Sequence, residues 1–296
     1  MNKPFNALND FFVRYFFTDK GGEKVLLDFI NAVMISADMK TFKAVEILNP
    51  FNLKKHYKDK ETIVDVKCIT KNGTVVIIEV QLSGNSRFPE RILYYWAYNY
   101  SKLLKKGEQY DDLTPVISIN LLNFNLNKKN SNVHSCYMIY DTKSKRLLTD
   151  HLQIHMIELK KFKFKDDNLP KDLNYWLGFF TTKDMEAYMS EIVKEKPIME
   201  EAHKRYNNFI RSRLMMTEYE KKELYQYDKQ ISLEDKRQEG IKEGRREGRL
   251  EGKLEGIKEG IKENSYAIAK SLKASGLDNK FISEHTGLTI EEIEKL

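Results

Sequence analysis

The stretch TIVDVKCITKNGTVVIIEVQL, residues 62–82, decides the fold. Two runs rich in Val, Ile and Thr flank Lys-Asn-Gly at 71–73, which predicts a β-hairpin whose turn is set by Asn-Gly. The first strand carries Asp65, and the second carries Glu79 and Gln81. These polar side chains in an apolar hairpin are the first candidate site residues.

The number of residues in the turn decides whether the two carboxylates share a face of the sheet. A two-residue loop would place Asp65 opposite Val80, so that Glu79 points to the other face. A three-residue loop, with Gly73 in a positive-φ conformation, instead places Asp65 opposite Glu79. The two loops therefore make different predictions about a site.

We favour the three-residue loop because it keeps one face of the hairpin wholly apolar. The pairs on that face are Val64 with Val80, Val66 with Ile78, and Cys68 with Val76. A slip of one residue would mix carboxylates into this row. The other face then carries two like charges side by side, which destabilises a sheet unless the repulsion is offset. A bound divalent cation is the simplest offset.

Length and composition indicate a soluble globular protein of roughly two domains. The 296 residues include 50 Lys and Arg and 44 Asp and Glu, and the net charge of +6 fits a nucleic-acid partner without establishing one. No run of about 18 apolar residues and no signal-peptide core is present, so we expect no membrane segment and a cytoplasmic location. Cys68 and Cys136 stand far apart, which supports neither a disulfide framework nor a thiolate zinc site.

Before the hairpin, the pattern predicts helices at residues 5–17 and 22–36 and a strand at 42–48. Asn9 or Asp10 sits near the start of the first helix, where a carboxylate either caps the helix or faces a site. Capping or solvation is the more frequent role.

A helix is expected after the hairpin, from about Pro89 to Lys106, with Gly107 at its C-terminal end. The residues that share one of its faces are Arg91, Tyr95, Tyr98 and Lys102. This face could meet the phosphates and bases of a nucleic acid. Alternatively, the helix covers the sheet and half-buries its tyrosines. We favour the second interpretation for the tyrosines and the first for Arg91.

Three more strands are expected at residues 114–124, 133–140 and 152–159. His151 and His155 have the spacing of metal ligands on a helix, but their segment alternates as a strand. A metal site at these histidines is therefore not expected.

The C-terminal part contains a Glu-Gly repeat. Residues 239–260 hold six Glu-Gly pairs at an interval of four, and six helical glycines cost roughly 5 to 6 kcal/mol relative to alanine. The repeat is either a charged linker or a helix that forms when packed, and we favour the helix. Leu250, Leu254, Ile257 and Ile261 supply a short apolar seam for self-association.

The tail after the repeat resembles a helix-turn-helix unit. Gly276 and Gly287 are placed as helix C-caps, and Thr289 with Glu292 forms a capping box. The last helix, TIEEIEKL, has three Glu against one Lys, which would repel phosphates. Packing or oligomerisation is therefore favoured over DNA binding for this tail.

The order of elements resembles the PD-(D/E)XK nuclease superfamily: helix, strand, strand with Asp, Asn-Gly turn, strand with Glu-x-Gln, and Arg-bearing helix. More narrowly, several stretches look like the Rpn family of recombination-promoting nucleases and putative transposases. These are Asp65, IIEVQ at 77–81, RILYYWAYNYSKLLKKGEQYDDL at 91–113 and TPVISINLLNF at 114–124. The resemblance covers about residues 5–160, and the Glu-Gly repeat is also similar to tails in that family.

This resemblance implies an α/β fold, a restriction-endonuclease-like mixed sheet flanked by helices, followed by a helical C-terminal region. It also implies hydrolysis of DNA with Mg²⁺ or Mn²⁺. Asp65 and Glu79 match the metal-binding carboxylates, Gln81 stands where the superfamily usually has Lys, and Asp10 would be the helix-borne acidic residue. A glutamine can orient a water molecule but brings no charge.

Arg91 is expected to clamp a phosphate, with Arg87 and Lys102 as further DNA-binding residues. The expected segments are a nuclease-like domain at 1–165, a helical extension at 166–232, the Glu-Gly repeat at 233–264 and the small tail at 265–296. We expect self-association through residues 233–296.

The leading hypothesis is an endonuclease of a mobile-element, recombination or defence type. One alternative is a nuclease fold that has lost activity and binds DNA or self-assembles. Another is a coiled-coil adaptor in which the tail is the functional part.

Overall fold

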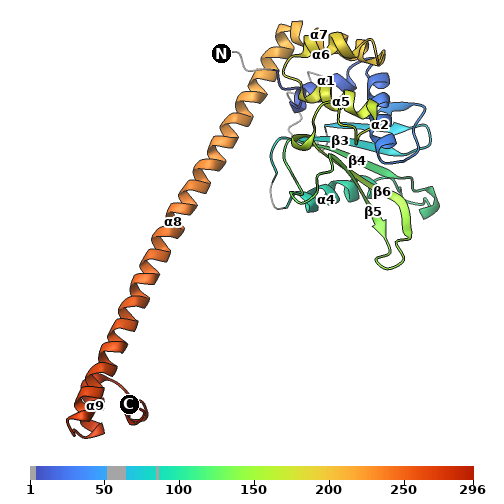
Figure 1. Cartoon of the computed structure of the whole chain (residues 1–296). Coiled ribbons are helices and arrows are strands. Elements are labelled where there is room, and N and C mark those ends of the chain that lie inside the picture. The colour runs from blue at the N-terminus through green and yellow to red at the C-terminus, as the bar shows by residue number, and fades with distance from the viewer. Residues whose placement is uncertain (1–4, 52–64, 85–86) are drawn as a thin grey trace. The chain divides into compact units, whose positions relative to one another are not determined.

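A mixed β-sheet forms the centre of the first part of the chain in the computed structural model, which describes residues 5–51, 65–84 and 87–296 (Figure 1). The strands of this sheet lie in the order β1-β2-β3-β4-β6-β5. Their bounds are β1 Val45–Ile47, β2 Val66–Thr70, β3 Val75–Gln81, β4 Val116–Leu122, β5 His134–Tyr140 and β6 Leu147–Glu158. β3, β4 and β6 pair in parallel, and the other neighbours are antiparallel. The expected α/β fold with a mixed sheet is confirmed.

The hairpin of β2 and β3 has the three-residue turn. Val66 pairs with Ile78, and the Thr70 N–H donates to the Thr74 carbonyl at 2.9 Å. Gly73 has φ +81°, a conformation that favours glycine because other residues place a Cβ against the backbone there. The predicted apolar pairs Val66 with Ile78 and Cys68 with Val76 lie in the core. The predicted pair of Val64 with Val80 includes a residue outside the described part of the chain.

Helices cover the two faces of the sheet differently (Figure 1). The helices against the face with Val66 and Cys68 are α1 Asp10–Thr18, α2 Glu23–Ser36 and α5 Lys171–Thr181. The other face carries α4, Phe88–Ser101, whose Trp96 packs against the cluster of Val75, Ile77 and Val116. Because side chains alternate along a strand, Glu79 points to the same face as Ile77, towards α4.

Aromatic packing joins α1 to helices far along the chain. Phe16 is fully buried and stacks on Phe179 of α5 with ring centroids 4.9 Å apart. α6 (Met185–Ile192) and α7 (Ile198–Arg211) complete this layer. From α7, the buried Arg205 donates Nε–H to the Phe16 carbonyl at 2.7 Å and also bonds the carbonyls of Tyr15, Asp19 and Lys20. These carbonyls lie in the last turn of α1 and just after it, so the guanidinium supplies donors where a helix C-terminus leaves carbonyl acceptors open.

Two helix boundaries differ from the sequence prediction. α1 begins at Asp10 rather than residue 5, because the Asn9 side chain accepts the N–H groups of Phe11 and Phe12 and caps the helix there. α4 ends at Ser101, with Lys102 as its C-cap, rather than at Lys106. The Ser101 hydroxyl donates to the Tyr98 carbonyl at 3.0 Å, the local competition by which serine weakens a helix end.

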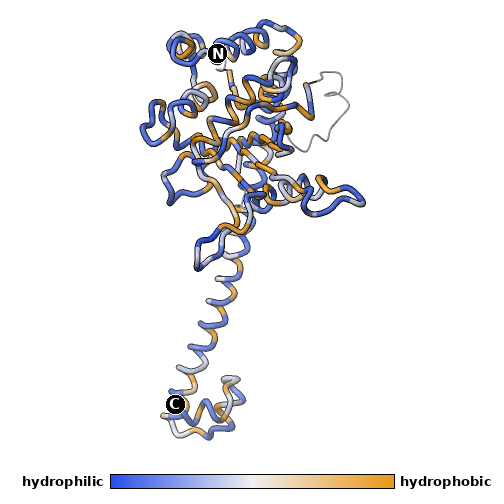
Figure 2. The backbone as a smooth tube through the Cα atoms, turned by 90° about the vertical axis from the view of Figure 1, so that its right-hand side faces the viewer, coloured by the Kyte–Doolittle hydropathy of each residue, from blue (hydrophilic) through white to orange (hydrophobic). Residues whose placement is uncertain are grey.

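The chain divides into two compact units, Met1–Leu224 and Tyr225–Leu296. One 62-residue helix, α8 (Arg213–Ala274), runs through the division and includes the whole Glu-Gly repeat. The residues along this long helix are mostly hydrophilic, with isolated apolar ones among them (Figure 2). Added Cβ atoms at its six glycines would meet nothing within 4 Å. The repeat is thus helical, and its glycines lie open.

The C-terminal end of α8 packs with two short helices, α9 (Asn279–Thr286) and α10 (Ile290–Glu294). Ala269 and Ile282 are fully buried in the small core that they share. The capping box of Thr289 and Glu292 is present, as expected. Within the described residues, no helix is both long and apolar enough to cross a membrane.

Candidate active site

Two carboxylates meet where β2 begins and β3 ends. The Val80 N–H donates to Asp65 Oδ2 at 2.8 Å, which fixes the Asp65 side chain across the hairpin. The register that pairs Val66 with Ile78 brings Asp65 beside Glu79 one residue further along. Glu79 is 7% exposed, and its buried Oε1 has no hydrogen-bond partner among the described residues.

The environment of this pair disfavours two negative charges. Burial, followed by the charge of Asp10, raises the pKa of Asp65 to about 7. Burial, followed by the charge of Asp65, raises the pKa of Glu79 well above its usual range. Buried carboxylates that repel one another need a proton or a cation to coexist. The pair therefore has the electrostatic character of a cation site rather than of a structural ion pair.

The third acidic residue, Asp10, comes from the first turn of α1. Asn9, not Asp10, caps that helix, and the Asp10 carboxylate acts on Asp65 through its charge. Lys222, from the part of α8 inside the first unit, lies 3.3 Å from Asp10 Oδ2. Its charge lowers the pKa of Asp65 and partly offsets the repulsion. Sequence reasoning missed Lys222, because it stands in a long Lys- and Glu-rich segment with no distinguishing pattern.

Arg91, Gln81 and Glu79 form a hydrogen-bonded row. Arg91 Nη2 donates to Gln81 Oε1 at 2.5 Å, and Gln81 Nε2 faces Glu79 Oε2 at 3.4 Å. The arginine fixes the orientation of the amide, so that the amide NH₂ points to the carboxylate. Arg91 thereby brings a positive charge to the strand position where glutamine has none.

The oxygen groups present fit a divalent cation. Among the described residues, no group of three or more His, Cys, Asp or Glu converges as a complete metal site. However, Glu79 leaves one buried oxygen unpaired, and Asn120, its partner on β4, buries an unpaired Oδ1. Carboxylate and amide oxygens are the ligands that Mg²⁺ and Ca²⁺ prefer, and an unpaired buried oxygen is otherwise costly. Asn120 carried no signal in the sequence because it lies inside an apolar strand.

The remaining candidates lie apart from this centre. Arg87 precedes α4 as its N-cap and is exposed. Lys102 follows the last turn of α4, about 16 Å along the helix axis from Arg91, and its Nζ stands 5.4 Å from the centre of the Tyr98 ring. His151 bonds the Tyr100 hydroxyl at 2.9 Å, whereas His155 bonds His134 at 3.0 Å. The two histidines therefore have different partners.

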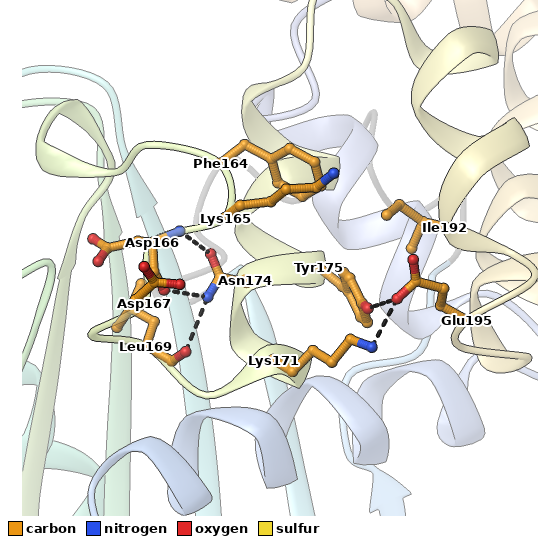
Figure 3. A pocket seen from close by; sticks show the side chains of 10 residues that line it. All are labelled: Phe164, Lys165, Asp166, Asp167, Leu169, Lys171, Asn174, Tyr175, Ile192 and Glu195. Atoms are coloured by element: carbon orange, nitrogen blue, oxygen red, sulfur yellow. Dashed lines mark hydrogen bonds and ion pairs between the residues drawn. The ribbon is translucent and has the colours of Figure 1, made fainter.

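A cavity of 370 Å³ lies elsewhere in the first unit, beside α5 (Figure 3). Asn174 donates to the carbonyls of Asp166 and Leu169, and both Tyr175 and Lys171 bond the Glu195 carboxylate. Because these groups satisfy one another, the cavity has the character of a structural cluster. The unpaired Oε1 of Glu79 makes the carboxylate pair the stronger candidate for a functional site.

A family model described as "PD-(D/E)XK nuclease family transposase" matches residues 7–236. Neither the search of curated proteins nor the search of solved structures found a match. The matched range includes the hairpin, α1, α4 and Lys222, so every group that surrounds the carboxylate pair lies within it.

Proposed function

Since the chain belongs to the PD-(D/E)XK nuclease family transposases, we propose that it is an endonuclease that hydrolyses phosphodiester bonds of DNA with a divalent metal ion. Nucleases of this superfamily usually use divalent metals. The observation that carries the proposal is the pair formed by the half-buried Asp65 and the buried Glu79, whose raised pKa values and unpaired oxygen call for a cation. The proposed setting is cytoplasmic, in DNA mobility, recombination or defence.

Asp65 and Glu79 would hold the metal ion, Mg²⁺ or Mn²⁺, with Asp10 as a further acidic group close to Asp65. When bound, such an ion polarises the phosphate and increases the acidity of water. The protein contributes position and charge. Val80 N–H holds the Asp65 carboxylate, and Gln81 holds the Glu79 carboxylate.

Positive side chains complete the proposed centre. Arg91 is half buried, so part of its side chain remains accessible to a ligand. It is placed to bind a phosphate oxygen beside the carboxylates while it orients Gln81. Lys222 supplies a second positive charge near Asp10. These two groups would stabilise the negative charge that develops on the phosphate.

The decisive experiment compares the intact protein with Asp65→Ala on supercoiled plasmid, with Mg²⁺ or Mn²⁺. We expect cleavage to fall at least about 100-fold, because even indirect partners of metal ligands are worth 10- to 100-fold. Asp111→Ala, which changes an exposed aspartate on the short helix Tyr110–Asp112, is the matched control and should cut normally. Equal cleavage by the two variants would overturn the assignment.

A second candidate keeps the nuclease fold without activity and assigns the protein a DNA-binding or assembly role. Gln81 in place of a lysine favours it, since an uncharged amide removes one catalytic cation. Its signature would be absence of cleavage at any metal concentration together with absence of metal binding to the intact protein. Binding of Mn²⁺ that is lost in Asp65→Ala would favour the enzyme.

Self-association through residues 233–296 is a further part of the proposal. Leu250, Leu254, Ile257 and Ile261 of α8 are between 50% and 63% exposed within their unit. Their spacing of 4, 3 and 4 is that of a coiled-coil seam. Sedimentation of the intact protein, compared with a variant carrying Ser at these four positions, would show whether the seam joins two copies.

A further inference from the structure

Two tyrosines on α4 are exposed in a way that the sheet-covering role of the helix does not explain. Phe88, Ile92 and Trp96 on the opposite side of the helix pack against the strands. Tyr94 is 67% exposed, and Tyr98 is 39% exposed. Tyr95 and Tyr98, expected to be half buried, are both partly buried, whereas Tyr94 lies largely exposed.

These tyrosines lie on the helix that enters the candidate active site. Arg91, one turn before Tyr94, bonds Gln81 on β3. Tyr98 follows Arg91 by two turns, about 10 Å along the axis, and Lys102 follows Tyr98 by one turn. At 100° per residue, Arg91, Tyr98 and Lys102 fall within about 20° of one line. A straight path therefore leads from the carboxylates along the Tyr98 ring to a lysine, with Tyr94 to one side, about 60° around the helix from Arg91.

The charge around this path is positive. Residues 87–106 contain five basic residues, Arg87, Arg91, Lys102, Lys105 and Lys106, and one acidic residue, Glu90. Their sum is 5 − 1 = +4. Lys102 Nζ stands 5.4 Å from the centre of the Tyr98 ring, within the range of a cation–π contact. Aromatic rings between cations are the arrangement by which proteins hold an unpaired nucleic-acid strand, because bases stack on rings while phosphates meet the cations.

We propose that α4 holds a single-stranded segment of DNA, with bases stacked on Tyr94 and Tyr98 and phosphates on Arg91 and Lys102. The inference rests on the proposed nuclease function and specifies its substrate as DNA that is unpaired next to the cleavage point. A fully paired duplex keeps its bases inside the helix, so it cannot use the exposed rings. The substrate class is therefore single-stranded, forked or flapped DNA.

A DNA-binding measurement under conditions in which no cleavage occurs tests this proposal. Full-length Asp65→Ala protein in EDTA is titrated against a labelled oligothymidylate of about ten nucleotides, and the Kd is read from fluorescence anisotropy. A second probe has the same backbone without bases. Adding Tyr98→Ala should raise the Kd for the first probe between about 5-fold and 150-fold, the usual range for one stacked base. It should leave the Kd for the baseless probe unchanged.

Two further variants separate stacking from other effects. Tyr98→Phe keeps the ring and loses the hydroxyl, so it should bind the oligothymidylate as Tyr98 does. Tyr140→Ala removes a similarly exposed tyrosine, 49% accessible, from β5, and should have no effect. The proposal is overturned if Tyr98→Ala binds like Tyr140→Ala, or if the baseless probe loses the same affinity.

Cleavage distinguishes this proposal from the function on which it rests. If the protein with intact Asp65 cuts fully paired duplex faster than a forked substrate of the same sequence, the single-strand path is wrong and the nuclease assignment stands. If the stacking variants behave as expected but no substrate is cut, the path is retained and the nuclease assignment fails.

Discussion

At the scale of single residues, the positive charge at the candidate site comes from side chains on several elements and not from the strand that carries Gln81. The strand position with a neutral amide, Gln81, receives a guanidinium from α4, and the repulsion around Asp65 is reduced by Lys222 from α8. A lysine at position 81 could supply the positive charge on the strand and also reduce the repulsion around Asp65. In this protein the two positive charges come from separate helices, Arg91 from α4 and Lys222 from α8. Each charge therefore depends on how its own helix packs against the sheet or against α1.

The raised pKa of Asp65 predicts how stability depends on pH. Its pKa rises from an ordinary 3.8 to about 7, so between these pH values the folded chain holds a proton that the unfolded chain has released. The free energy of unfolding must therefore fall as pH rises from about 4 to 7, at up to about 1.4 kcal/mol per pH unit for this group. Asp65→Asn should flatten this fall. Urea denaturation at pH 5 and pH 8 in EDTA would measure it.

Glu79 contributes in the same direction, so the variant should retain part of the slope. At pH 8, Mn²⁺ should restore stability to the protein with Asp65 and not to Asp65→Asn. If the free energy of unfolding of the two proteins changes with pH in the same way, Asp65 is solvated and its pKa is not raised.

At the scale of elements, the hairpin turn sets the position of the two carboxylates. Gly73 at φ +81° allows the three-residue loop, and Thr114 Cγ2 stands 2.9 Å from the place where a Cβ would be. The sequence predicted this register because a wrong turn would have moved every side chain of β3 to the opposite face. A pairing register of this kind constrains side-chain positions only between neighbouring strands.

Gly73→Ala should destabilise the protein by about 1 to 2 kcal/mol from backbone strain alone, with the Thr114 contact as an added cost. Gly107→Ala is the matched control, since Gly107 has φ +96° and open space around it. Chemical denaturation of both variants isolates the contact as the difference between them. If the two lose equal stability, Thr114 moves aside at no cost.

The ends of helices were less predictable from the sequence, for a physical reason. Residues 5–9 have a helical pattern, yet Asn9 draws the first N–H groups of α1 to its own side chain. α8 contacts the site through Lys222, and that contact depends on how two distant helices pack. Neither periodicity nor composition encodes such a contact, whereas the paired carboxylates of the hairpin follow from alternation along two adjacent strands.

At the scale of the whole molecule, the first turns of α8 belong to the nuclease-like unit. The ring of Tyr219 stacks on Phe5 with centroids 4.7 Å apart, and its hydroxyl accepts the Asn6 N–H at 2.7 Å. Glu223 accepts from the Asn9 side chain at 2.8 Å. The start of the long helix thus holds the segment that carries Asp10, and the family match extends as far as residue 236.

Two truncations should therefore behave differently. A chain ending at Ser232 keeps Tyr219, Lys222 and Glu223, so it should retain the thermal stability of the first unit and any cleavage activity. A chain ending at Ser212 loses them and should be less stable by about 3 kcal/mol or more, the usual cost of removing a large buried aromatic residue. Calorimetry and plasmid cleavage on the two chains would check this. Equal stability would show that α8 contributes nothing to the first unit.

The contact of Arg205 with the end of α1 has a consequence for biosynthesis. The carbonyls that it binds belong to residues 15–20, and the partners of Asn6 and Asn9 come later still, at Tyr219 and Glu223. During translation the N-terminal helix emerges first and can pack on α2 and β2, yet its contacts with Arg205, Tyr219 and Glu223 form only after the ribosome has added some two hundred further residues. An interrupted polypeptide would carry the acidic hairpin without a fixed Asp10. Under the proposed function, an unfinished chain would therefore lack the third acidic group of the candidate site.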